Sequence, residues 1–501
     1  MEDPLWVSMM VWGTWLLVAI VIDGVLLPLK LLLARKSLKN LNNDITVEDD
    51  ELPQISIVIP AHNEEERIHE CLLSIINSEY PPEKMQVIAV DDGSEDGTRS
   101  QIKKASVDAI MKGVRIQLIE KIHTGKVHSL NTGLRKATGE IIFTVDADVI
   151  LEKTALKNMV KVFLADPDVG AASGYIEVRW DPLKVRFREK FFSRCEFLEY
   201  LNSFNFERNY QSWIDSLYTM SGAFSAFRRE VMGSVGGYWP VTVAEDMHVT
   251  MMLHKKKINV INVPDAIGYV SAITDYDTLY SQRSRWARGQ LEVAAISGKS
   301  YYEENRTSFR DILSIIRDSR DPKLIKLIFS YLWNLLRDSF KELKGKTWRY
   351  FDLMGLMRIL FVDHTIAFPR LLWVFVLILL PFMGLYIEVI PVVMLLMYVF
   401  YILVDLIVTV FTYNYSSGKT RQKIEEAIPF IVLMPIYRIM IFCFRVSAFL
   451  QSLNEPADWK VEGPINGIKN GANNMKENVA KSVEAMILGL SGTYFSRKRG
   501  K

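Results

Sequence analysis

The sequence predicts an α/β protein in which a mainly parallel sheet domain is combined with an α-helical transmembrane region. Residues 55–165 alternate short β-rich runs with amphipathic stretches in four successive units. Long apolar segments lie on both sides of this alternating region. Hydrophobic residues make up 49% of the 501-residue chain, and its mean hydropathy is +0.10. This is more apolar than one soluble core requires, so part of the chain is expected to lie in a membrane.

Charge and cysteine content exclude several classes of protein. The 60 Lys and Arg residues nearly balance 58 Asp and Glu residues, giving a net charge of +2. A chain without a broad positive surface is not expected to bind nucleic acid. Cys71, Cys195 and Cys443 are far apart and form no C-x-x-C pattern, which favours buried thiols in a reducing compartment.

The N-terminal apolar segment is interpreted as a transmembrane helix within residues 1–36. Residues 5–33 are long enough to span roughly 30 Å of hydrocarbon, and they lack a small-residue cleavage site. Acidic residues precede the segment and four basic residues lie at its end, namely Lys30, Arg35, Lys36 and Lys39. The positive-inside rule therefore places the following region in the cytosol, after a polar linker at residues 37–54.

The C-terminal half predicts amphipathic interface helices at residues 301–368 and transmembrane helices at 369–453 that form a polymer channel. Three apolar segments are expected to span the membrane, at residues 371–390, 391–411 and 428–450. Three crossings leave residues 454–501 outside, whereas their basic end, SRKRGK, predicts a cytosolic tail. Either one segment does not cross or the tail departs from the rule. Arg438, near the middle of the last segment, is expected to line a polar path.

Polar side chains follow the predicted parallel strands, where ligands bind in sheets of this kind. Acidic residues dominate, and the candidates are Ala61, Asn63 and Glu64 after the first strand, Asp91 and Asp92 after the second, and Asp146 and Asp148 after the fourth. The first unit has no G-x-G-x-x-G turn, which argues against a dinucleotide cofactor. The sequence SSGKT at 416–420 lacks the upstream glycine of a P-loop.

The pair Asp146 and Asp148 predicts a metal site. On a strand, residues two apart point the same way, and two like charges so close are costly without a cation. Mg²⁺ and Mn²⁺ commonly bind one or two carboxylates together with phosphate oxygens. Taken alone, the pair could equally be two incidental acids in a solvated loop.

Seven motifs in one order identify a family resemblance: IVIPAHNEE, VDDGSEDGT, GKVHSLNTGL, VDAD, SGAFSAFRR, AEDM and QRSRWARG. Together they resemble the family 2 processive, inverting glycosyltransferases, such as the cellulose, chitin, hyaluronan and poly-N-acetylglucosamine synthases. The resemblance covers residues 55–300. It implies a GT-A-type, Rossmann-like cytosolic domain, a UDP-sugar donor and a Mg or Mn ion.

The resemblance also implies roles for the donor-side residues. The first two strand ends would surround the uridine, Lys126 would lie near the diphosphate, and Asp148 would bind the metal. Asp146 would contact the metal, the ribose or the donor sugar. Asp246 matches the family's catalytic base, and its place at a helix N-terminus is expected to keep it ionised. Glu245 would orient a loop or the acceptor.

The remaining motifs imply an acceptor site and a gate. Gln282, Arg285 and Trp286 form the Q-x-x-R-W pattern, in which Gln282 and Arg285 would bind the donor, the arginine at its diphosphate, and the indole would stack on the acceptor sugar. Ser221 and Gly222 would flank the acceptor. Trp459 and Lys460 lie where relatives carry a gating segment, although the sequence here departs from the W-G-T-R form.

The predicted function is a multi-pass enzyme of the cell membrane that transfers a sugar, best matched as N-acetylglucosamine, from a UDP-sugar to a growing polysaccharide and translocates the chain. Expected partners are the UDP-sugar, the glycan, the lipid bilayer and accessory membrane or export subunits. The alternative is a non-processive glycosyltransferase that acts on a lipid-linked acceptor. A transporter with a nucleotide-binding domain would need more spans and no catalytic base. The motifs do not define the sugar or the linkage.

Overall fold

The computed structural model describes residues 20–41, 47–183, 186–304 and 389–452. Several predictions fall outside these residues. They concern the first part of the N-terminal apolar segment, the interface helices after residue 304, nearly all of the first C-terminal apolar segment, and the segment with Trp459 and Lys460.

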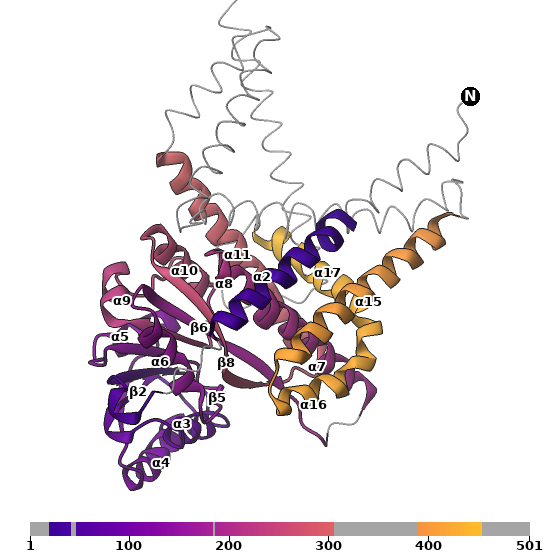
Figure 1. Ribbon diagram of the computed structural model, residues 1–501. Coiled ribbons are helices and arrows are strands. Elements are labelled where there is room, and N and C mark those ends of the chain that lie inside the picture. The colour runs from indigo at the N-terminus through magenta and orange to yellow at the C-terminus, as the bar shows by residue number, and fades with distance from the viewer. Residues whose placement is uncertain (1–19, 42–46, 184–185, 305–388, 453–501) are drawn as a thin grey trace, which may run out of the picture.

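A mixed eight-stranded sheet forms the centre of the described chain (Figure 1). Its strand order is β3-β2-β1-β4-β7-β6-β8-β5. The strands are β1 Ile55–Ala61, β2 Met85–Asp92, β3 Arg115–Lys121, β4 Ile141–Val145, β5 Ile150–Leu151, β6 Val169–Arg179, β7 Phe224–Arg228 and β8 Asn259–Ser271. Strands β1 to β4 pair in parallel, as do β6 and β8, whereas β7 is antiparallel to both of its neighbours. The predicted mainly parallel sheet is confirmed.

Helices cover both faces of this sheet, and the strand sequences explain why. Ile57 and Ile59 on β1 belong to a core with one set of helices, while Val58 between them belongs to a core on the other face. A parallel sheet buried on both sides requires such continuous apolar strands. The first face is covered by α3 Ile68–Ile76, α4 Thr98–Met111 and α6 Ala155–Ala165, and the second by α5 Lys126–Leu134, α9 Arg229–Val235 and α10 Glu245–Lys255.

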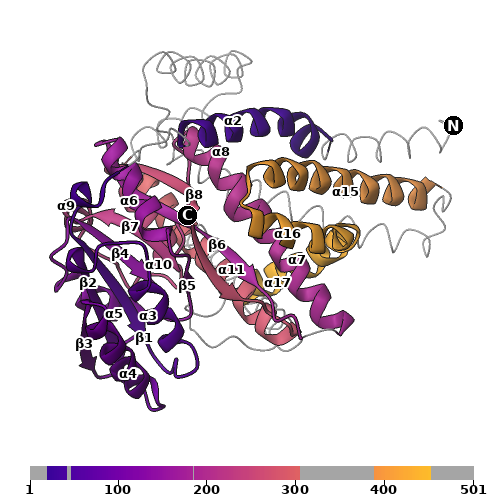
Figure 2. The ribbon, with the colours of Figure 1, turned by 60° about the horizontal axis from the view of Figure 1, so that its bottom comes forward.

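A second group of helices packs beside β6 and β8. Helix α7 Phe187–Tyr200 continues through a π-helix, η4 Leu201–Glu207, into α8 Arg208–Trp213. Helix α7 lies between β6 and the C-terminal helix α16, as Figure 2 shows. The long helix α11 Tyr276–Glu304 carries the Q-x-x-R-W motif. Short 3-10 turns also occur at η2 Asp49–Glu51 and η3 Pro82–Lys84.

The apolar terminal segments form helices as expected. They are η1 Ile20–Val25, α2 Leu26–Leu41, α15 Val389–Tyr415, η8 Ile428–Leu433 and α17 Met434–Ser452, and the polar helix α16 Gly418–Ala427 connects α15 to η8. Helix α2 runs to Leu41, so the polar segment expected as a linker from residue 37 begins with helix. By length and composition, two helical stretches in the described chain could cross a membrane, Met394–Tyr415 and Gly418–Phe449.

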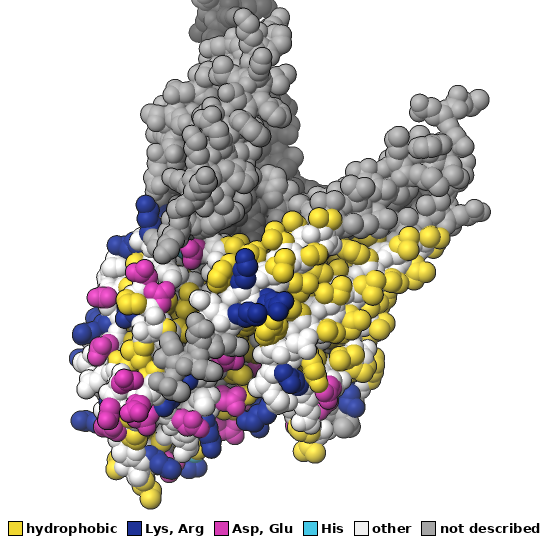
Figure 3. Space-filling view, viewed as in Figure 1, with side chains coloured by type: hydrophobic (Ala, Val, Ile, Leu, Met, Phe, Trp, Pro, Cys, Tyr) yellow, Lys and Arg dark blue, Asp and Glu magenta, His cyan; other side chains and the backbone are white. Residues whose placement is uncertain are grey.

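An exposed apolar surface runs over α2 and α15 (Figure 3). Its side chains include Leu26, Leu29 and Leu32 of α2 and Val392, Leu395, Leu396, Val399, Leu403, Ile407 and Val410 of α15. Contiguous apolar surface of this extent marks a membrane or protein interaction site.

Helix α16 fastens the apolar helices to the sheet domain through ion pairs. Lys423 and Thr420 contact Glu177, a fully buried carboxylate of β6, with the Thr420 hydroxyl 2.7 Å away. Lys419 lies 2.9 Å from Glu152, which follows β5. Ser417 caps the helix by accepting a hydrogen bond from the Thr420 N–H. The side chains of the SSGKT sequence therefore serve a helix start and its docking.

Arg438 on α17 forms an ion pair with Asp405 on α15. The ion pair connects two apolar helices, and the expectation that Arg438 lines a polar path stays a prediction. Such a pair offsets the cost of placing each charge in apolar surroundings.

Candidate active site

The carboxylates Asp146 and Asp148 lie in a turn, because β4 ends at Val145 and the Val149 N–H bonds to the Asp146 carbonyl at 3.1 Å. The expectation that both sit on a strand and point the same way is wrong. In the turn, the two carboxylates contact different basic side chains. Lys126 contacts Asp146 at 2.8 Å, whereas Arg67 approaches Asp148 at 3.8 Å.

Lys126, at the start of α5, connects the turn after β4 to the start of α10. Its ammonium lies 2.8 Å from Asp146 and 3.0 Å from Glu245. Although burial lowers the pKa of Lys126, the two carboxylates outweigh it and the net pKa lies well above the ordinary value. Burial also raises the pKa of Asp146 to about 6, against the lowering effect of Lys126. Lys126 is therefore a permanent positive charge between two motifs 99 residues apart, at 146 and 245.

Glu64 is a third carboxylate on the predicted donor side. Burial and the charge of Asp148 raise the pKa of Glu64 to about 7, while Arg67 lowers it. Arg67 lies 4.0 Å from Glu64 and 3.8 Å from Asp148, with about half of its side chain exposed. The three acids Glu64, Asp146 and Asp148 therefore repel one another, and a cation would relieve that repulsion.

Asp246 lies in the first turn of α10, as predicted, but the helix does not lower its pKa overall. Burial and, next, the adjacent Glu245 raise the pKa of Asp246 from 3.8 to a net value of about 6. Lys126, the Met247 N–H and Arg208 act in the opposite direction. A carboxylate with such a pKa is still ionised near pH 7 and is a stronger base than an ordinary aspartate.

The loop before β7 holds Asp246 from the other side. The Gly222 N–H donates to Asp246 Oδ2 at 3.1 Å, and the Met247 N–H donates to Oδ1 at 2.7 Å. A Cβ atom on Gly222 would lie 3.0 Å from Asp246 Oδ2, so a larger residue would press on the carboxylate. The neighbouring Ser221 N–H bonds to the Ser173 hydroxyl at 2.9 Å.

Arg208 is a buried cation beside this loop that the motif analysis missed. Its guanidinium donates to the Ser173 hydroxyl at 3.3 Å and stacks 4.4 Å from the Phe204 ring. Burial lowers the pKa of Arg208 to about 10, partly offset by Tyr218 and Asp246. No carboxylate among the described residues lies within ion-pair distance of it. No sequence pattern distinguishes Arg208 from the other arginines, because its burial and its position beside the loop are visible only in the folded structure.

Asp91 and Asp92 are buried and already hydrogen-bonded. Asp91 pairs with Arg99 and accepts from the Ser94 N–H at 3.1 Å. Asp92 pairs with Lys121 and accepts from the N–H groups of Thr124 at 3.0 Å and Gly125 at 2.8 Å. Burial raises the pKa of Asp92, but these donors outweigh burial and lower it.

The loop after β1 adopts a strained turn next to these acids. Ala61 ends the buried strand, and Asn63 has a left-handed φ of 54°. The Asn63 side chain accepts from the Glu95 N–H at 2.9 Å, which ties the two loops together. His62 and His123 stack with ring centroids 4.1 Å apart at this rim.

The Q-x-x-R-W residues lie on α11, with the Trp286 ring 37% exposed and available to a ligand. Tyr200 and Phe204 flank it, with centroids 6.2 and 5.9 Å from that of Trp286. Burial lowers the pKa of Arg285, whereas the charge of Glu245 raises it. Arg285 on α11 therefore interacts electrostatically with Glu245 on α10. Gln282 accepts a hydrogen bond from the adjacent Arg283.

The structure thus brings the predicted donor residues to one edge of the sheet and connects them to Glu245 beside Asp246. No group of three or more His, Cys, Asp or Glu side chains in the described ranges is arranged to hold a metal ion by itself. A cation at Asp146 and Asp148 would need further oxygens, such as those of a diphosphate.

The mainly parallel sheet, with carboxylates after its strands and a candidate base at α10, defines a GT-A-type glycosyltransferase domain. Residues 56–236 match the family model described as "Glycosyl transferase family 2". The chain therefore carries a family 2 glycosyltransferase domain, and the predicted enzyme class is confirmed.

Curated relatives extend the similarity beyond this domain. The poly-beta-1,6-N-acetyl-D-glucosamine synthase of Staphylococcus aureus is 28% identical over 298 residues, which are 59% of this chain and 66% of that protein. The synthase of the same name from Staphylococcus epidermidis is 28% identical over 247 residues, covering 49% and 57%. The match thus spans 66% of the length of the first relative and 57% of the second.

Solved structures show weaker likeness. A mannosyltransferase from Pyrobaculum calidifontis, in complex with GDP-Man and Mn²⁺, is 22% identical with a TM-score of 0.43, covering 70% of this chain and 99% of that one. Residues 1–349 of S. aureus TarS in complex with UDP are 19% identical with a TM-score of 0.32, covering 48% and 65%.

Proposed function

We propose that this chain transfers N-acetylglucosamine from UDP-N-acetylglucosamine to the end of a growing polysaccharide. The observation that carries the proposal is the double contact of Lys126 with Asp146 and Glu245. It joins the donor side of the sheet to Glu245, the residue next to the candidate base Asp246, so that one sugar could reach both. The choice of sugar is supported by the name of the S. aureus relative.

Asp246 would act as the general base. An acceptor hydroxyl is a weak nucleophile until a carboxylate removes its proton. As the acceptor oxygen bonds to the anomeric carbon, its proton passes to Asp246 and the UDP group leaves from the opposite face, which inverts the anomeric centre. The N–H groups of Gly222 and Met247 hold the two Asp246 oxygens in place for this transfer.

Asp148 and Asp146 fit a divalent cation. Their mutual repulsion with Glu64 and the partial exposure of Asp148, 38% for its side chain, leave room for one. Mg²⁺ or Mn²⁺ would supply positive charge against the diphosphate. Lys126 would add a fixed positive charge on the same side, and Arg285 a guanidinium that can pair with phosphate oxygens.

Trp286 would hold the acceptor. Its exposed indole, flanked by Tyr200 and Phe204, offers an apolar face of the kind on which sugar rings stack. Ser221 and Gly222 would line the path between this platform and Asp246. The predicted uridine contacts after β1 and β2 belong to the same proposal.

The apolar surface of α2 and α15 supports a membrane location. A cytosolic catalytic domain and translocation of the glycan across the bilayer belong to the same proposal. Helix α17 packs along α11 through Phe444, Ser447 and Gln451. A helix packed on the domain in this way favours the alternative in which the last apolar segment, residues 428–450, does not cross the membrane. A cytosolic tail would then agree with its basic end.

Purified full-length protein, Mn²⁺ and a panel of UDP-sugars would test the proposal. We expect UDP release with UDP-N-acetylglucosamine and a polymer, and the β-1,6 linkage of the relatives is the first to examine with linkage-specific glycosidases. No UDP release from any donor would contradict the proposal. Addition of a single sugar to a lipid-linked acceptor would instead support the non-processive alternative.

A further inference from the structure

Three helices meet in a chain of contacts that ends at Trp286. The hydroxyl of Tyr437 on α17 donates to Glu199 Oε2 on α7 at 2.9 Å. The same oxygen accepts from Arg283 on α11 at 2.6 Å. The guanidinium carbon of Arg283 lies 4.3 Å from the centroid of the Trp286 ring. The apolar helix α17 is therefore linked to the exposed indole through two polar side chains.

The side chains that form this chain of contacts are buried. The side chains of Tyr437 and Arg283 are 1% and 3% exposed. A second buried carboxylate, Glu196, lies 3.9 Å from Arg283, and its other oxygen accepts from the Ile273 N–H at 2.8 Å. Two carboxylates thus flank one guanidinium, and a donor to Glu199 relieves the excess negative charge. Polar groups in such surroundings fix one another more firmly than they would in water.

The orientation of Arg283 depends on few partners. Its Nε atom has no hydrogen-bond partner among the described residues. The guanidinium is placed by Glu199, Glu196, the adjacent Gln282 and Tyr200, whose ring centroid lies 5.5 Å from the guanidinium carbon. The guanidinium of Arg283 stacks on the Trp286 ring, so a shift of Glu199 would move the group against which the indole packs. Tyr437 holds Glu199 in place through its hydrogen bond.

We propose that Tyr437 is a positioning residue for the acceptor, which acts through Glu199 and Arg283 on Trp286 and couples α17 to the acceptor site. The proposal rests on the proposed function, since it takes Trp286 as the acceptor platform. The donor residues Lys126 and Asp146 lie on α5 and the turn after β4, outside this chain of contacts, whereas the donor candidate Gln282 is bonded to Arg283 on α11. Loss of the Tyr437 hydroxyl should therefore alter acceptor use more than donor use.

Tyr280 offers a matched control. Its buried hydroxyl also joins α11 to α17, by hydrogen bonds with Ser447 at 2.8 Å and Gln451 at 3.1 Å. Tyr280→Phe thus removes inter-helix bonds between the same two helices without touching Glu199 or Arg283. Both variants would be made in the full chain and compared by thermal unfolding in detergent.

The test measures the KM for a defined N-acetylglucosamine oligosaccharide, the KM for the UDP-sugar, and the product length. For Tyr437→Phe we expect about a fivefold rise in acceptor KM and shorter products, with a smaller change in donor KM. Glu199→Gln should move the acceptor KM in the same direction. Tyr280→Phe should leave both KM values and the product length unchanged, even if it lowers the unfolding temperature.

Two results would overturn the inference. One is a Tyr437→Phe enzyme with wild-type acceptor KM and product length. The other is an equal acceptor effect in Tyr280→Phe, which would assign the effect to general packing of α17. Absence of UDP release by the wild-type chain would overturn the proposed function and, with it, the inference. The two results above, obtained with an active wild-type chain, would overturn the inference alone, so the two failures are distinguishable.

Discussion

Lys126 Nζ lies 3.0 Å from Glu245 Oε1, and this contact places the start of α5 against the start of α10. The same ammonium lies 2.8 Å from Asp146. Donor-side and acceptor-side residues therefore share one charge. Its removal would leave two carboxylates without a partner, next to the candidate base.

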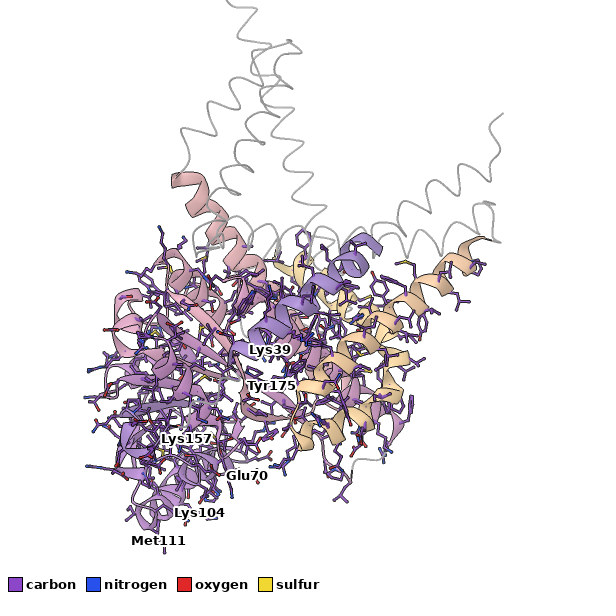
Figure 4. The ribbon with its side chains drawn as sticks, viewed as in Figure 1. Lys39, Glu70, Lys104, Met111, Lys157 and Tyr175 are labelled. Carbon is purple, nitrogen blue, oxygen red and sulfur yellow. The ribbon has the colours of Figure 1, made fainter. Side chains whose placement is uncertain are left out.

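Replacement of Lys126 by Met tests this shared charge. We expect a rise of at least tenfold in the KM for the UDP-sugar and a fall in kcat, because Asp146 and Glu245 would repel both each other and the diphosphate. Steady-state kinetics of UDP release would measure both values. Lys104→Met is the control, since Lys104 is exposed on α4 at the far end of the domain from α10 (Figures 1 and 4). Equal kinetics in the two variants would contradict the proposed role of Lys126.

The pH dependence of the reaction should report Asp246. Its pKa of about 6 means that the base becomes protonated as the pH falls through 6. We expect kcat/KM to fall tenfold per pH unit below that value. Arg208 lowers the pKa of Asp246, so Arg208→Met should move the acid limb to higher pH.

Two variants control this pH experiment. Arg208→Lys keeps the charge and should retain the wild-type limb, while Arg135→Met removes an arginine on the outer end of α5. An acid limb that stays in place in Arg208→Met would show that Arg208 does not influence the base.

Gly222→Ala should slow the reaction by pressing on the base. The new Cβ would lie 3.0 Å from Asp246 Oδ2 and 3.3 Å from Asp246 Cγ. We expect kcat to fall about tenfold or more, because a displaced base no longer reaches the acceptor hydroxyl. Gly233→Ala on α9 is matched, since its Cβ would meet no atom within 4 Å. Wild-type kcat in Gly222→Ala would contradict the close approach of this loop to Asp246.

Asp148→Asn should weaken cation binding in the presence of UDP. Titration of Mn²⁺ followed by electron paramagnetic resonance measures this directly, without turnover. We expect at least a tenfold rise in the dissociation constant, since one of the two carboxylates would lose its charge. Asp108→Asn, on the outer part of α4, serves as control. Unchanged Mn²⁺ binding in Asp148→Asn would place the cation elsewhere.

Much of the sheet domain could be predicted from the sequence because its signals are local. The apolar runs that became β1, β2 and β4 are continuous, and each is followed by polar residues at the strand end. The turn that separates Asp146 from Asp148 was missed because one residue between two acids is compatible with a strand as well as a turn. Only the backbone bond from Val149 to Asp146 distinguishes them.

The contacts around the site could not be predicted in the same way. Arg208, Ser173 and Glu199 lie far in sequence from the motifs they support, and their residue types are common. The rise in the pKa of Asp246 was also missed, because a helix N-terminus is visible in the sequence whereas burial, the largest cause of the rise, depends on packing. Long-range packing, and not local pattern, determined these features.

The base role of Asp246 is the central claim, and Asp246→Asn tests it most directly in purified protein with UDP-N-acetylglucosamine and Mn²⁺. The substitution keeps the shape of the side chain and removes its ability to take a proton. The account predicts that polymer formation falls by a factor of about 10² to 10⁴ while UDP binding, measured by calorimetry, is retained. Polymer formation at the wild-type rate in Asp246→Asn would contradict the account.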